Sequence, residues 1–179
     1  MAAPKKDLRE TVKGQSRLLE KIELFVPGFS GYKEKEIRRA ADRLLREALA
    51  GELKGVNEAV ESAFENITES KMTEAYDAMN TATALMDKII GKVETADYGY
   101  ASFFDAIKIR EDALDAMYEF DKRLFEDVEA IGRDAEKLVA ATDKDDKPAV
   151  ARIAKDLKRA INDFDKKFDQ RKAVLLKLE

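Results

Sequence analysis

Apolar residues recur at intervals of three and four along almost the whole chain, and this spacing is the feature that most restricts its fold. A period of this kind places the apolar side chains on one face of an α-helix. The clearest run keeps this spacing throughout, at Met72, Ala75, Met79, Ala82, Met86, Ile89 and Val93. No window of four to eight residues alternates between apolar and polar side chains as a half-buried strand would. The sequence therefore predicts an all-α protein.

Breaks in the pattern divide the chain into about five predicted helices. They are expected near residues 7–25, 33–68, 70–93, 102–138 and 148–178, with Ser70 as the N-cap of the third. The second run keeps its phase through Gly51 and Gly55. Each of these glycines costs about 1 kcal/mol relative to alanine, but the unbroken phase favours one long helix over two.

Stripes of this length predict an elongated up-and-down antiparallel bundle of about five helices with coiled-coil-like packing. The 179 residues are expected to form a single domain, with a short flexible N-terminus over residues 1–6. Two charged residues, Arg110 and Asp121, interrupt the stripe of the fourth predicted helix. Each is expected to meet an opposite charge on another helix or to lie where the bundle thins.

The composition removes most catalytic chemistry. The chain contains no cysteine and no histidine, which excludes cysteine nucleophiles, Ser-His-Asp triads, zinc knuckles and di-iron sites of the Glu-x-x-His type. Neither of the glycine-rich phosphate-binding motifs is present. We therefore expect no enzyme activity, no catalytic residues and no cofactor.

A site for a hard metal ion built only from carboxylates stays open as an alternative. Glu111, Asp115 and Glu119 share a helix face, and their spacing resembles the E/D-x-x-x-D pattern of PhoU-like helical regulators. Because the chain has 37 acidic residues and these three miss the apolar stripe, a solvated face is the favoured interpretation and no metal ligand is assigned.

Charge is distributed unevenly along the chain. Residues 1–50 hold 12 basic and 8 acidic side chains, residues 51–146 hold 11 and 24, and residues 147–179 hold 10 and 5. The favoured interpretation is that basic terminal helices form ion pairs with an acidic middle. The alternative is a basic surface for nucleic acid or anionic lipid, but the acidic middle leads us to expect no tight binding of DNA or RNA near physiological salt.

Nothing in the sequence indicates a membrane protein. No stretch approaches the 18 apolar residues of a membrane span, and no apolar run follows the first lysines as in a signal peptide. The expected compartment is the cytoplasm.

Two short breaks concentrate aromatic side chains, one over residues 25–32 and one over residues 96–105. Their strings, PGFSGYKEKE and ADYGYASFFD, resemble the PG-aromatic-x-GY-x-x-KE and ADYGY-x-x-FFD elements of a family of uncharacterised prokaryotic all-helical proteins. The resemblance covers roughly residues 20–130. It implies a helical fold and no catalytic residue, cofactor or substrate.

Counting chain reversals in an up-and-down bundle places both aromatic breaks at the same end. The aromatic rings are expected either to plug that end of the core or to form a docking patch for a partner. The residues predicted for this docking pole are Phe29, Tyr32, Lys33, Lys35, Asp97, Tyr98, Tyr100, Phe103, Phe104 and Asp105. The function expected from the sequence is that of a non-enzymatic scaffold or adaptor that acts through protein contacts at this pole, with self-association as a further option.

Overall fold

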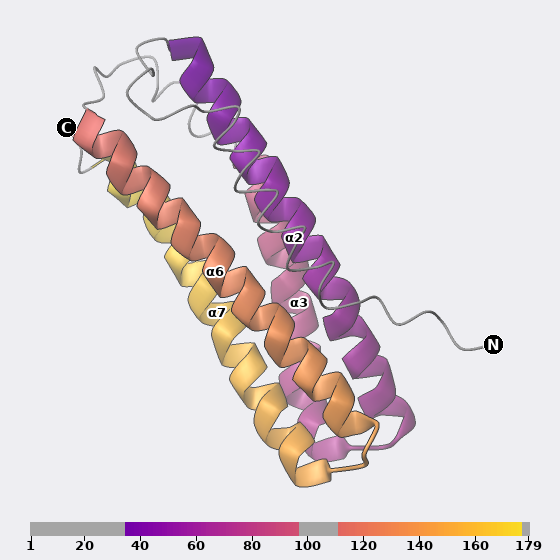
Figure 1. The fold of residues 1–179 in the computed structure, drawn as a ribbon. Helices are drawn as coiled ribbons and strands as arrows, with labels where there is room; N and C mark the ends of the chain where they lie inside the picture. The colour runs from indigo at the N-terminus through magenta and orange to yellow at the C-terminus, as the bar shows by residue number, and fades with distance from the viewer. Residues whose placement is uncertain (1–34, 97–110, 177–179) are drawn as a thin grey trace.

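The computed structural model describes residues 35–96 and 111–176, and the side chains of residues 43–96 and 119–171. Four helices occupy these ranges: α2 (Lys35–Glu69), α3 (Thr73–Thr95), α6 (Glu111–Thr142) and α7 (Lys147–Leu176) (Figure 1). No strand occurs in the described ranges, so the prediction of an all-α fold is confirmed. Four helices pack against one another rather than about five, and the first predicted helix, at residues 7–25, lies outside the described residues.

Helix α2 is continuous through its two glycines. It runs for 35 residues, as predicted for the second apolar run. A Cβ atom added at Gly51 or Gly55 would meet nothing within 4 Å. Both glycines therefore lie on an open side of the helix, and the chain does not reverse its direction at either of them.

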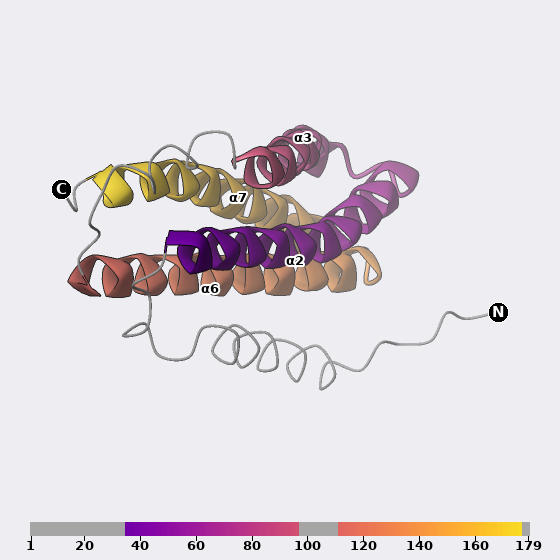
Figure 2. The ribbon, with the colours of Figure 1, turned by 90° about the horizontal axis from the view of Figure 1, so that it is seen from above.

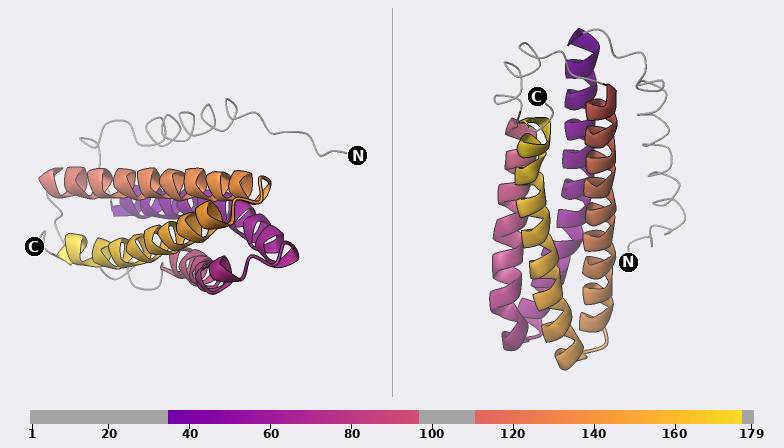
Figure 3. Two further views of the ribbon diagram at one scale, coloured as in Figure 1. Left: turned by 90° about the horizontal axis from the view of Figure 1, so that it is seen from below. Right: turned by 90° about the vertical axis from the view of Figure 1, so that its left-hand side faces the viewer.

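The four helices form a ring in which each contacts two others. The contacting pairs are α2 with α3, α6 with α7, α3 with α7, and α2 with α6. Successive helices alternate in direction, as predicted, but the pairs α2/α6 and α3/α7 run parallel (Figures 1 and 3). The expectation of antiparallel neighbours throughout is therefore wrong for these two pairs, because α6 follows α3 in the chain but lies diagonally across the bundle from it.

The hairpin of α2 and α3 packs on the hairpin of α6 and α7 in parallel. The sequence offset between residues that lie side by side is therefore nearly constant. Between α2 and α6, the Asn66 amide donates to Thr142 Oγ1 at 3.3 Å across 76 residues of sequence. Between α3 and α7, Lys88 Nζ donates to Asp165 Oδ2 at 2.7 Å across 77 residues. A residue of the first hairpin thus lies beside the residue about 76 positions later in the second.

The apolar stripes read from the sequence form one continuous core. All seven residues of the α3 stripe are buried. Each of the other three helices also contributes residues of its stripe to this core, among them Leu49, Leu53, Val60, Leu124, Val128, Leu138, Leu157, Ile161 and Phe164. At Gly132 the α6 backbone comes close to α2, because an added Cβ would lie 3.2 Å from Val56 Cγ2.

The turn between α2 and α3 is of the same kind as the turn between α6 and α7. Lys71 and Asp145 have positive φ, at 52° and 50°. After each of them the next backbone N–H donates five residues back, from Met72 to Ile67 and from Asp146 to Ala141. These are Schellman turns, in which a left-handed residue closes the helix.

The start of α3 differs from the sequence prediction. Its N-cap is Met72, with no side-chain capping bond. Ser70 is not the cap, because the Schellman turn places it at the end of α2 instead. The start of α7 is capped in the ordinary way, since Asp146 Oδ1 accepts a hydrogen bond from the Ala149 amide at 3.2 Å.

Candidate functional site

The two ends of the bundle are unlike each other. At the turn end lie the two Schellman turns, at residues 70–72 and 143–146. At the opposite end, which we call the distal end, α2 and α6 begin and α3 and α7 finish (Figure 1). The predicted docking pole adjoins the distal end through Lys35, the first residue of α2, and through Ala96, which follows α3 and precedes Asp97. Its other members lie outside the described residues.

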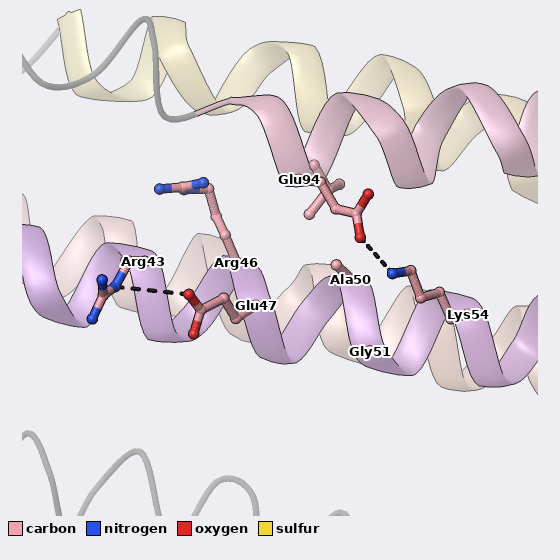
Figure 4. Close-up of a pocket in the computed structure, with 8 residues that line it drawn as sticks. Arg43, Arg46, Glu47, Ala50, Gly51, Lys54 and Glu94 are labelled. Atoms are coloured by element: carbon pink, nitrogen blue, oxygen red, sulfur yellow. Dashed lines mark ion pairs between the residues drawn. The ribbon is translucent and has the colours of Figure 1, made fainter.

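A hollow of about 330 Å³ opens between α2 and α3 near the distal end (Figure 4). Small or apolar residues and charged residues both line it. The lining residues are Arg43, Arg46, Glu47, Ala50, Gly51, Lys54, Val93 and Glu94. The sequence analysis did not predict this hollow, whose signal in the sequence is the pair of small residues Ala50 and Gly51.

Charges around the hollow are mostly paired. Lys54 Nζ lies 2.5 Å from Glu94 Oε1 of α3, and Arg43 Nε lies 3.7 Å from Glu47 Oε1 one turn along α2. Arg46 is buried. The hollow is therefore a polar recess with nearly balanced charge, which suits a mixed protein surface better than a polyanion.

A buried ion pair joins α6 to α7 in the distal half of the bundle. Arg171 Nε donates to Asp121 Oδ1 at 2.7 Å, and Nη2 donates to Oδ2 at 2.9 Å. Both side chains are almost completely buried, at 0% and 1% exposure. The prediction that Asp121 meets an opposite charge on another helix is confirmed, whereas Arg110 lies outside the described residues.

Asp165 is the centre of a second network, between α3 and α7. It accepts hydrogen bonds from Lys88 and Lys92 at 2.7 and 2.5 Å, and Lys92 also lies 2.7 Å from Asp169. Burial alone would raise the pKa of Asp165, but the two lysines outweigh it and lower that pKa. The same contacts raise the pKa of Lys92 against the opposing effect of its own burial.

Buried charge in the described part of the chain is confined to the distal half. Four charged side chains are buried there: Arg46, Asp121, Asp165 and Arg171. Towards the turn end the interior is apolar except for Asn57 and Thr142. Because a buried charge needs a fixed partner, the distal half depends on specific pairing in addition to apolar packing.

Ion pairs between helices are present, but their polarity is mixed. Arg171 and Lys167 of α7 pair with Asp121 and Asp127 of the acidic middle, as the charge distribution predicts. The pairs from Lys88 and Lys92 to Asp165 have the opposite polarity. Two basic side chains on the exposed face of α7, Arg159 and Lys166, have acidic neighbours three residues before them.

The described residues offer no metal site. No group of three or more acidic side chains in this part of the chain is arranged to hold an ion. Of the three residues weighed from the sequence, Glu119 is exposed, and the side chains of Glu111 and Asp115 lie outside the described set. None of the helices described is long and apolar enough to cross a membrane.

Comparison with known proteins gives no match to a family model, to a curated protein or to a solved structure. The resemblance carried by the two aromatic strings thus gains no second support, and function is argued from the geometry of this chain.

Proposed function

We propose that the protein is a non-enzymatic scaffold or adaptor whose distal end docks a protein partner. The observation that carries this proposal is topological: α2 begins and α3 ends at the same end of the bundle (Figure 3). The aromatic segments at residues 25–32 and 96–105 are directly continuous with those helix ends. Aromatic residues gathered at one pole are typical of the core of a protein interface.

Two further features of the distal end support docking. The hollow beside Gly51 supplies a recess with cationic and anionic walls, into which a partner side chain could reach. The buried ion pair between Arg171 and Asp121 and the contacts of the buried Asp165 carboxylate add fixed polar contacts to the apolar core in this half of the bundle. Interface hot spots commonly consist of aromatic residues surrounded by a polar rim.

Affinity isolation with matched tyrosine variants tests the proposal. The tagged chain is isolated from its native cell as wild type, as Tyr98→Ala and as Tyr76→Ala. Tyr76 is the control because it is an exposed tyrosine, at 45% exposure, near the turn end. We expect one partner to be retained by wild type and by Tyr76→Ala and lost by Tyr98→Ala, with the thermal unfolding of Tyr98→Ala unchanged. Equal capture by all three forms, or equal loss in both variants, would contradict docking at the distal end.

A further inference from the structure

The outward side of α2 carries an incompletely covered face. Leu44 is 42% exposed, and Ala48 and Ala59 are only half-buried on the same side. Gly51 and Gly55 are exposed between them, with open space where a side chain would be. We refer to this strip, residues 44, 48, 51, 55 and 59, as the α2 outer face.

The α2 outer face borders the side of the helix nearest α6, and at Gly51 it also borders the hollow between α2 and α3. Val56 contacts the position of Gly132, and Glu52 lies close enough to Glu129 of α6 for the two charges to interact. Ala48 precedes Glu52 by four residues and Ala59 follows Val56 by three, so each lies about one turn from that neighbour on the same side of the helix. Figure 2 shows the first part of α2 beside α6.

Negative charge on this side is only partly compensated by the described residues. Burial raises the pKa of Glu52, and the neighbouring Glu129 carboxylate raises it further. Glu129 has Arg133 at 3.5 Å on its own helix. Glu52 has no lysine or arginine within ion-pair distance among the residues described. An occupant of the α2 outer face should therefore be apolar on one side and basic beside it.

The chain's own residues 7–25 have that chemistry. Their apolar stripe is Leu8, Val12, Leu19 and Ile22. Between positions 5 and 21 there are six basic residues against three acidic ones. Two of these basic residues, Arg9 and Lys13, directly follow Leu8 and Val12 in the sequence.

Connectivity sets the register of this segment against α2. The Pro27–Gly31 break comes four residues before α2 begins, so a helix preceding it can fold back along α2 in the antiparallel direction. From Phe25 back to Leu8 is 17 residues, about 26 Å of helix, and from Lys35 forward to Glu52 is also 17 residues. Leu8 and Arg9 then reach the level of Glu52, and Val12 reaches the level of Ala48.

We propose that residues 7–25 form a helix that packs antiparallel on the α2 outer face, between α2 and α6, with its basic side chains facing Glu52 and Glu129. Its apolar stripe covers Leu44 and Ala48, and the two glycines allow close approach of the backbones. The proposal does not depend on partner docking at the distal end.

Disulfide scanning in the full-length chain tests this arrangement, since the protein has no cysteine of its own. Ala48→Cys is combined in turn with Leu8→Cys, Val12→Cys and Leu19→Cys, and each form is oxidised with copper phenanthroline at two protein concentrations. A disulfide forms efficiently only when the two Cβ atoms come within about 4.5 Å. We expect a disulfide within one chain, strongest for the Val12 pair and independent of protein concentration.

The matched control replaces Ala48→Cys by Lys166→Cys. Lys166 is an exposed residue of α7, a helix without extensive contact to α2, at a similar height in the bundle. We expect only background oxidation for Lys166→Cys with Val12→Cys. The proposal is overturned if no Ala48 pair exceeds this control, or if linkage joins two chains and increases with concentration, which would assign the face to a second copy.

Discussion

Asp121 and Arg171 illustrate how a charge placed in an apolar stripe is tolerated. Two nearly parallel hydrogen bonds of 2.7 and 2.9 Å join the Arg171 guanidinium to the Asp121 carboxylate. The sequence reveals such a residue because it interrupts a regular stripe. It does not reveal the partner, since Arg171 is 50 residues away on another helix.

Removing one member of this pair should destabilise the fold strongly. Asp121→Ala leaves the Arg171 guanidinium buried without that carboxylate, and we expect the free energy of unfolding to fall by about 3–5 kcal/mol. Urea denaturation measures the change. The exposed control Asp156→Ala, which removes a pair with Arg159, should lose less than about 1 kcal/mol.

Replacing both members with apolar residues separates charge pairing from packing. Asp121→Leu combined with Arg171→Met should lose much less than Asp121→Ala alone, because no buried charge is left without its partner. A double variant as unstable as the single one would show that the pair does not act as a unit.

Stability at acid pH should depend on Asp165. The pKa of Asp165 is lower in the folded chain than its ordinary value. Its contribution is therefore fully present above the unfolded-state pKa of about 3.9 and is lost as the pH falls through the lower folded-state pKa.

Asp165→Asn checks this dependence. At neutral pH the variant should be less stable by about 1.5–3 kcal/mol, the range for hydrogen bonds to charged groups. Between about pH 5 and pH 2 the wild type should lose stability relative to the variant, so that the two denaturation midpoints converge. A difference that stays constant across this window would contradict the proposed linkage.

At the scale of the helix, glycine has two different roles in this bundle. Gly91 of α3 has open space at its Cβ position, whereas Gly132 of α6 lies close to Val56. Gly91→Ala should raise the free energy of unfolding by about 0.8–1 kcal/mol, the intrinsic difference in helix propensity. Gly132→Ala gains the same propensity but pushes α6 away from α2, so it should be the less stable of the two variants. Thermal or urea unfolding of the pair decides this, and a larger gain at Gly132 would contradict the close approach of α2 and α6.

The turn after α2 contains a residue that is strained for its type. Lys71 adopts a φ of 52°, a conformation that glycine reaches without a steric penalty. Lys71→Gly should therefore stabilise the protein by about 0.5–1 kcal/mol, as measured by thermal unfolding. Lys71→Ala is the control, because alanine keeps a Cβ, and it should give no gain. A gain in both variants would point to the loss of the lysine charge rather than to the backbone.

How much of each element the sequence predicts depends on whether the signal is local. The continuity of α2 through Gly51 and the burial of Met79 and Ile89 follow from periodicity within one helix, and the structure confirms them. The α3 cap and the parallel packing of α2 with α6 do not follow from it. Both depend on contacts between segments that are distant in sequence. Apolar spacing does not indicate which neighbouring helix a stripe faces.

For the candidate site, the sequence identified the kind of residue rather than the place. It showed an excess of basic residues over residues 1–50, whereas the hollow beside Gly51 also requires Val93 and Glu94 of α3, which lie opposite. The members of the predicted docking pole other than Lys35 lie outside the described residues. Their grouping at one end therefore stays a prediction.

As a whole molecule, the bundle has one apolar core along its length, and buried charge in the described part of the chain lies only in its distal half. Charged contacts in an interior fix one arrangement of the helices without adding much net stability. We infer that the buried charge of the distal half serves a defined shape at a contact surface.

The measurement that tests this account most directly is a pair of distances between spin labels placed in the cysteine-free chain. Labels at Tyr32→Cys and Tyr98→Cys report whether the two aromatic segments share the distal end, and labels at Tyr32→Cys and Lys71→Cys report the length of α2. The 35 residues of α2 span about 52 Å, so the second distance should be near or above that value. The account predicts that the first distance is less than half of the second. A Tyr32–Tyr98 distance as long as the Tyr32–Lys71 distance would place the aromatic segments at opposite ends and contradict the proposed docking pole.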